Sequence, residues 1–123
     1  MKKILFLLLL NITIGCANPV HKNDVIGQYE AVYKRGVEIL QVNSDMTYHY
    51  SFKSSENSLV QEGKWEFEIE NGRATLIFHD FIFAHYSFER KGMWIVDVSR
   101  NMGGRVRLIV NPDLRYEFKK TPS

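Results

Sequence analysis

The sequence predicts an all-β protein: a small antiparallel meander β-barrel of about seven to nine strands, preceded by an N-terminal signal peptide. Apolar and polar residues alternate over most of the chain after residue 24, which is the period of half-buried strands. The alternating stretches are short, hairpin turn signals separate them, and no stretch carries a long helical period. We expect a barrel, because consecutive hairpins give a meander and closure of the sheet removes exposed edges.

Residues 1–15 have the three parts of a secretory signal peptide. Lys2 and Lys3 precede an apolar run that begins at Ile4, and small residues follow that run. A helix that spans a bilayer needs about 20 apolar residues, and this run is well short of that. The segment therefore indicates export rather than a transmembrane anchor.

The end of this segment, Thr13-Ile14-Gly15-Cys16, resembles the lipobox of bacterial lipoproteins. In that family the cysteine becomes the first mature residue and is acylated on its sulfur and its amine. Thr13 departs from the pattern, because the family prefers Leu there. The sequence holds no second cysteine that could pair with Cys16. We expect lipidation at Cys16; the alternative is a soluble secretory signal cut after Ala17.

We expect three segments: residues 1–15 as the lipoprotein signal peptide, 16–24 as the acylated cysteine and tether, and 25–120 as the barrel domain. Because Ala17 and not Asp follows the cysteine, the resemblance implies the periplasmic face of the outer membrane. Cleavage removes two of the 16 lysines and arginines and none of the 14 acids. The mature chain is therefore formally neutral, which gives no electrostatic case for nucleic acid as a partner.

The clearest hairpin surrounds Asn71-Gly72, because both central residues of a type I′ turn need a positive φ. Residues 64–70 before this turn alternate charged and apolar side chains. Folding the chain there pairs apolar residues on one face: Ile69 with Ala74, Phe67 with Leu76, and Trp65 with Phe78.

A second hairpin is expected around Asn101-Met102-Gly103, a three-residue loop that puts Gly103 at the position needing a left-handed backbone. The expected pairs are Val98 with Val106, Val96 with Leu108, Trp94 with Val110, and Asp97 with Arg107 on the outer face.

A third hairpin would pair Leu40 with Tyr50 and Val42 with Tyr48. Its loop, residues 44–46, puts Met46 at the left-handed position where glycine is usual. Either Met46 is strained by about 1 kcal/mol, or the loop has another shape.

The inward faces of the expected strands are rich in aromatic residues. In so short a chain these would nearly fill the barrel. The candidate interior residues are Tyr29, Tyr48, Trp65, Phe67, Trp94 and Tyr116.

Residues 78–88 differ from the other stretches, because they carry aromatic side chains on both faces of a strand and no turn residue. One interpretation is a strand covered on both sides. The other is an exposed apolar lip where a partner or lipid docks, with Phe81, Phe83 and Tyr86 as the contacts.

The chain resembles a set of small, uncharacterised bacterial envelope proteins and, more distantly, the lipocalin-type barrel of NlpE-type lipoproteins. The resemblance is carried by Gly27-x-Tyr29, Glu38-x-Leu40, Asp45-x-Thr47-Tyr48, Gly63-Lys64-Trp65-Glu66 and Asn111-x-Asp113-Leu114-x-Tyr116-x-Phe118-Lys119. It implies a lipocalin-like barrel. The Cys-x-x-Cys of NlpE-type proteins is absent, so metal or redox sensing by that motif is not implied.

The sequence shows no pattern that identifies a reaction. The candidate metal site is the cluster of His79-Asp80 with His85. If residues 79–85 form one strand, however, the two histidines lie about 20 Å apart, too far to share a metal ion. Alternating glutamates at 66, 68 and 70 are typical of a solvated outer face. There is no nucleophile elbow, phosphate loop or zinc motif. We therefore expect no catalytic residues, no metal and no cofactor.

Two function classes follow. We expect a non-catalytic lipoprotein, held to the membrane by its lipid, that acts through its surface on an envelope or secreted protein partner. The alternative, implied by the resemblance to lipocalins, is a carrier of a small apolar ligand inside the barrel.

Overall fold

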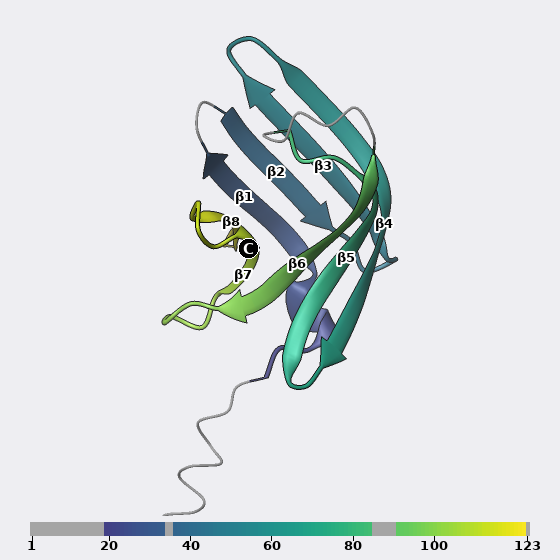
Figure 1. Cartoon of the computed structure of the whole chain (residues 1–123), viewed down its shortest axis with the longest axis vertical. Coiled ribbons are helices and arrows are strands. Elements are labelled where there is room, and N and C mark those ends of the chain that lie inside the picture. Colours follow the sequence, from purple (N-terminus) through teal and green to yellow (C-terminus); the bar gives the residue numbers. More distant parts are fainter. Residues whose placement is uncertain (1–18, 34–35, 85–90, 123) are drawn as a thin grey trace, which may run out of the picture.

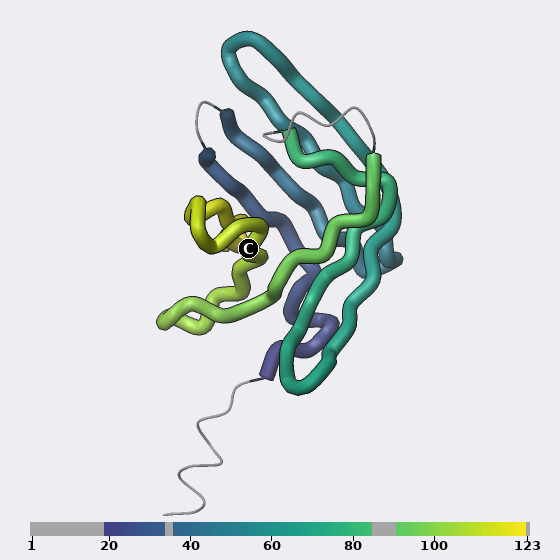
Figure 2. Tube along the Cα trace, in the orientation of Figure 1, coloured from purple at the N-terminus to yellow at the C-terminus, as the bar shows by residue number. Residues whose placement is uncertain are grey.

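The computed structural model describes residues 19–33, 36–84 and 91–122. In this part of the chain, eight antiparallel strands form a closed meander barrel (Figures 1 and 2), so the predicted all-β barrel is confirmed. A short 3-10 helix, η1 (Lys22–Val25), precedes the first strand. The strands are β1 (Gly27–Tyr33), β2 (Gly36–Val42), β3 (Thr47–Ser54), β4 (Ser58–Glu70), β5 (Arg73–Phe81), β6 (Gly92–Arg100), β7 (Val106–Asn111) and β8 (Tyr116–Lys120).

The barrel has two ends with different connections. The described chain enters at the end that carries η1 and the β2–β3, β4–β5 and β6–β7 turns; the β4–β5 turn is the lowest part of the barrel in Figure 1. We call this the N-terminal end. The β3–β4 and β7–β8 turns lie at the opposite, far end, where β5 also finishes. Pairing of Tyr29 with Lys120 and of Glu30 with Lys119 joins β1 to β8 and closes the sheet.

The β4–β5 hairpin has the predicted register. Ile69 lies opposite Ala74, Phe67 opposite Leu76 and Trp65 opposite Phe78. Asn71 and Gly72 have φ values of 52° and 77°, as a type I′ turn requires.

The β2–β3 loop also has the predicted form, because Met46 has a φ of 69°. Leu40 pairs with Tyr50 and Val42 with Tyr48, as expected. The Asp45 carboxylate accepts hydrogen bonds from the Thr47 amide (3.1 Å) and hydroxyl (2.5 Å). These contacts hold the loop in a shape that puts a methionine in the left-handed region.

The predicted register of the β6–β7 hairpin is wrong by two residues. Val98 lies opposite Leu108, and Ser99 rather than Asp97 lies opposite Arg107. Gly104, not Gly103, takes the left-handed position, with a φ of 82°. The reason is Asn101, whose side-chain oxygen accepts hydrogen bonds from the amides of Gly103 and Arg105, both at 3.0 Å, and so moves the loop one residue along the chain.

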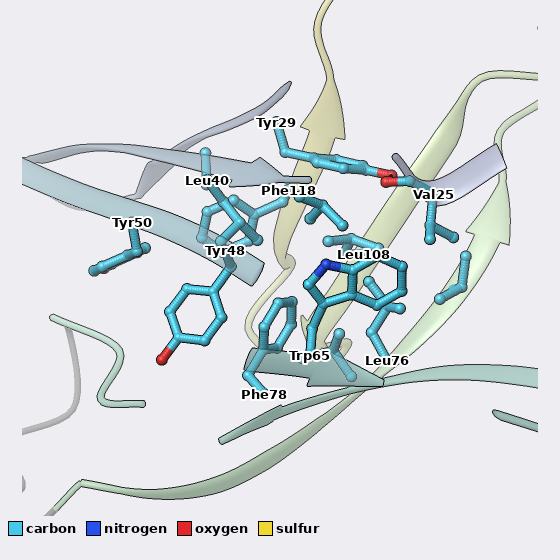
Figure 3. Packing of buried hydrophobic residues seen from close by; sticks show 14 of the residues in the cluster. Val25, Tyr29, Leu40, Tyr48, Tyr50, Trp65, Leu76, Phe78, Leu108 and Phe118 are labelled. Atoms are coloured by element: carbon cyan, nitrogen blue, oxygen red, sulfur yellow. Dashed lines mark hydrogen bonds between the residues drawn. The ribbon is translucent and has the colours of Figure 1, made fainter. Parts of the chain in front are cut away.

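Helix η1 closes the N-terminal end of the barrel. Val25 is fully buried, and its carbonyl accepts a hydrogen bond of 2.7 Å from the Tyr29 hydroxyl (Figure 3). Asp24 binds Arg100 at 3.0 Å, and its carbonyl accepts a hydrogen bond from Lys120. The backbone hydrogen bond from His21 lowers the pKa of Asp24 below its usual value. Residues 22–24, expected in the tether, therefore belong to the folded domain.

The core is the barrel interior. Trp65 is central in Figure 3, among Val25, Leu76 and Leu108, and its indole nitrogen donates to the carbonyl of Asn43 at 3.0 Å.

Among the described residues, no helix has both the length and the apolar character needed to cross a bilayer.

Candidate functional site

After a bulge near the end of β5, the chain leaves the sheet and turns into the barrel. The β5–β6 pairing shifts between Phe78 and Phe81, and Asp80 in this bulge has a left-handed backbone with a φ of 54°. An extra residue in a bulge interrupts the alternation of faces. Phe78 and Phe81 are three positions apart, yet both are fully buried in the core. Residues 81–84, which we call the strap, then lie inside the far end, beside β3 (Figure 1).

Inward side chains of β3 and β4 hold the strap and the bulge before it. Gln61 is 3% exposed; its side-chain nitrogen donates to the Ile82 carbonyl (2.5 Å), and its side-chain oxygen accepts from the Ile82 amide (3.0 Å). The Tyr50 hydroxyl accepts a hydrogen bond from the Ala84 amide at 3.1 Å. Tyr48 donates to the His79 carbonyl at 2.7 Å. Backbone groups that have left the sheet thus find side-chain partners, as buried backbone requires.

Gly63 makes room for one of these tyrosines. It lies opposite Tyr48 in the sheet, and a Cβ atom at Gly63 would lie 2.6–2.8 Å from the tyrosine ring and hydroxyl. Burial and the nearby Asp80 charge raise the pKa of Tyr48 to about 12. The hydroxyl therefore stays protonated and can donate to the backbone at any physiological pH.

The strap fills the far half of the barrel with aromatic rings. The Phe81 ring centre lies 4.8 Å from that of Tyr50 and 5.3 Å from that of Tyr48. The Phe83 ring centre lies 4.9 Å from that of Trp94 and 5.9 Å from that of Tyr116. Aromatic pairs at these separations stabilise a core beyond the area that they bury.

One acidic residue lies in this aromatic interior. Glu38 is 0% exposed, and its Oε1 atom accepts hydrogen bonds from the hydroxyls of Tyr50 (2.5 Å) and Tyr116. Burial raises the pKa of Glu38 above its usual value, which the two tyrosine hydrogen bonds offset only in part. Tyr50 therefore joins the Glu38 carboxyl group to the strap. Both tyrosines are fully buried, so the arrangement anchors the strap inside the barrel.

The predicted interior residues all lie on the inside of the barrel. Tyr29, Tyr48, Trp65 and Tyr116 are fully buried in the core, while Phe67 and Trp94 are partly buried and pack against it.

The predicted exposed lip is wrong for the residues that the structure describes. Phe81 is 0% exposed and Phe83 is 1% exposed, because the bulge at Asp80 turns both rings into the barrel. Tyr86 and Cys16 lie outside the described residues.

Histidines on the outer wall form pairs with single carboxylates. His79 lies 2.5 Å from Glu66, and His49 lies 3.7 Å from Glu62. His85 lies outside the described residues. In the part of the chain that the structure describes, no three histidine, cysteine or acidic residues gather where they could hold a metal ion.

Sequence reasoning missed Glu38 and Gln61 as the polar residues of the interior. Their positions carried a usable signal: Glu38 shares the inward face of β2 with Leu40 and Val42, and Gln61 shares the inward face of β4 with Trp65. A polar residue at an inward position of an alternating strand indicates a buried hydrogen-bonding role.

Comparison with known proteins adds no relative: no family model, no curated protein and no solved structure matches the chain.

Proposed function

We propose that this protein is a non-catalytic bacterial outer-membrane lipoprotein that acts through its outer surface, as an interaction or structural module of the cell envelope. The observation that carries the proposal is the filled interior. The chain's own Phe81 and Phe83 occupy the far half of the barrel, and η1 covers the N-terminal end. A barrel packed with its own side chains leaves the outer wall as the surface on which a partner acts.

The outer wall carries an aliphatic strip suited to contact. Val32 pairs with Val37 across β1 and β2, and Ile39 follows on the same face. Val60 on β4 lies two strands from Ile39, with Ser51 of β3 between them. All four side chains are exposed, and neighbouring exposed apolar side chains on an outer wall are a feature of interaction surfaces.

The anchor in this proposal is Cys16, acylated at the periplasmic face of the outer membrane. Three acyl chains bury enough methylene groups, at about 0.8 kcal/mol each, to make release negligible. Mass spectrometry of the membrane fraction tests this part. We expect a mature chain that begins at Cys16 and carries acyl groups; an unmodified chain beginning at Asn18 would contradict it.

The second candidate is a carrier of a small apolar ligand. It is favoured by one observation: hydrogen bonds from side chains, rather than a strand partner, hold the strap at Ile82 and Ala84. Displacing the strap would open an aromatic space with Glu38 at its wall.

An apolar fluorescent probe separates the two candidates. A carrier should bind about one probe per chain with micromolar affinity, near −8 kcal/mol, and binding should weaken when Trp65 is replaced. For the proposed surface module we expect no saturable binding. Saturable binding of one probe that depends on Trp65 would overturn the proposal.

A further inference from the structure

The N-terminal end of the barrel exposes apolar side chains around a hollow. Met102, at the β6–β7 turn, is fully exposed, and Ile69, at the end of β4, is 56% exposed. A hollow of about 520 Å³ lies between the two hairpins, with apolar lining that comprises Pro19, Val20, Ile69, Ala74, Val98 and Met102. The apolar rim therefore surrounds the point where the described chain begins.

Basic side chains accompany this rim. Arg73 follows the β4–β5 turn, and its side chain is 74% exposed. Lys22 on η1 and Arg105 in the β6–β7 turn are also exposed. Two acids lie beside them: Glu70 is exposed, and Asp97 forms an ion pair of 2.9 Å with Arg73. Lys22 and Arg105 thus lie beside exposed apolar side chains, a combination that suits the interfacial region of an anionic bilayer.

The covalent chain limits how far this rim lies from the lipid of the proposed anchor. Cys16 precedes Pro19 by three residues, and a chain of that length spans at most about 11 Å. An acylated Cys16 therefore holds the N-terminal end of the barrel within about one headgroup layer of the membrane. Contact between the rim and the bilayer is then intramolecular, so even weak contacts form at a high effective concentration.

We propose that the N-terminal end of the barrel is a membrane-contact face. Met102 and Ile69 enter the interfacial region of the bilayer, while Arg105 binds lipid phosphate. The far end, with its polar β3–β4 turn at residues 54–57, points away from the membrane. This inference rests on the proposed acylation of Cys16 and adds an orientation to it.

Fluorescence quenching at single labelled sites tests the orientation. Met102→Cys and Leu114→Cys place a thiol at opposite ends of the barrel, each at an exposed apolar side chain. In the acylated full-length protein the sulfur of Cys16 is blocked, so the environment-sensitive dye NBD reacts with the new thiol alone. The labelled proteins are reconstituted in vesicles of phosphatidylethanolamine and phosphatidylglycerol that contain nitroxide-labelled lipid.

We expect the emission of the label at position 102 to shift to the blue and to be quenched at least about twofold more than that of the label at position 114. Equal exposure of both labels to water, or stronger quenching at position 114, overturns the membrane-contact face while leaving acylation intact. Intact-mass measurement on the same samples identifies the other failure. An unacylated Cys16 overturns the proposed anchor and this inference together.

Discussion

Replacing Gln61 by leucine removes the hydrogen bonds that hold the strap at Ile82, while keeping a side chain of similar size. Gln61 both donates to the carbonyl of Ile82 and accepts from its amide, at 2.5 and 3.0 Å. In the Gln61→Leu variant, both backbone groups of Ile82 lose these partners inside a barrel whose interior is mostly aromatic and aliphatic.

The expected cost follows from those two groups. A buried donor or acceptor that loses its partner costs about 1–3 kcal/mol, and Ile82 is partly rather than fully buried. Taking the lower part of that range for each group, and a small gain from the apolar leucine, we expect Gln61→Leu to lower the free energy of unfolding by about 2–4 kcal/mol.

Urea denaturation and amide hydrogen exchange measure this effect globally and locally. Gln41→Leu is the matched control, because Gln41 lies on the outer face of β2 and pairs there with His49. We expect the control to change stability by less than about 0.5 kcal/mol. The amides of Ile82 and Ala84 should exchange faster only in Gln61→Leu. The proposed role of the Gln61–Ile82 hydrogen bonds is refuted if both variants have the same stability and the Ile82 amide stays protected from hydrogen exchange.

Three further predictions test other parts of the fold. Met46→Gly and Met46→Ala both lose a partly buried side chain, but only glycine relieves the strain of the positive φ. Chemical denaturation should therefore find the glycine variant about 1 kcal/mol more stable than the alanine variant. Equal stability of the two variants would mean that this backbone is unstrained. Burial raises the pKa of Glu38 above its usual 4.5. The stability that the buried, protonated Glu38 side chain contributes is therefore fully present below pH 4.5 and is lost as the pH rises through the raised pKa. Glu38→Gln should remove this decline, which is at most about 1.4 kcal/mol per pH unit, and parallel pH profiles of the two proteins would argue against it. Phe83→Ala should cost about 3–5 kcal/mol in thermal or urea unfolding, whereas Leu114→Ala, at an exposed site, should cost little; similar values for both would place Phe83 outside the core.

Alternation and turn residues together predicted the barrel and two of its hairpins. At Asn71-Gly72 the turn residues fix one register, because both central positions need a positive φ. At Gly103-Gly104 two neighbouring glycines fit the left-handed position equally well. A shift of two residues keeps every side chain on its face, so the apolar pattern does not distinguish the two registers. The side chain of Asn101 decides between them.

The strap was beyond prediction from the local pattern for a different reason. Residues 78–88 carry aromatic side chains on both faces, which a strand exposed on one side does not explain. The bulge at Asp80 turns the chain inward, and the partners that stabilise the turned backbone, Gln61 and Tyr50, are distant in the sequence. A prediction from alternation has no information about such non-local hydrogen bonds.

The strap also sets how strongly any ligand inside the barrel could bind. A ligand that needs the far half of the interior must displace the strap, and its apparent affinity falls by the fraction of molecules in which the strap is open. If opening costs about 4 kcal/mol, that fraction is about one in a thousand, and an intrinsic micromolar affinity becomes millimolar. If the carrier alternative holds, removing the Gln61 hydrogen bonds with Gln61→Leu should raise the apparent affinity for the ligand at least about 30-fold. Probe titrations of the wild type and of this variant decide the matter: tighter saturable binding by the variant favours a carrier, and no saturable binding by either favours a surface module with a barrel filled by its own chain.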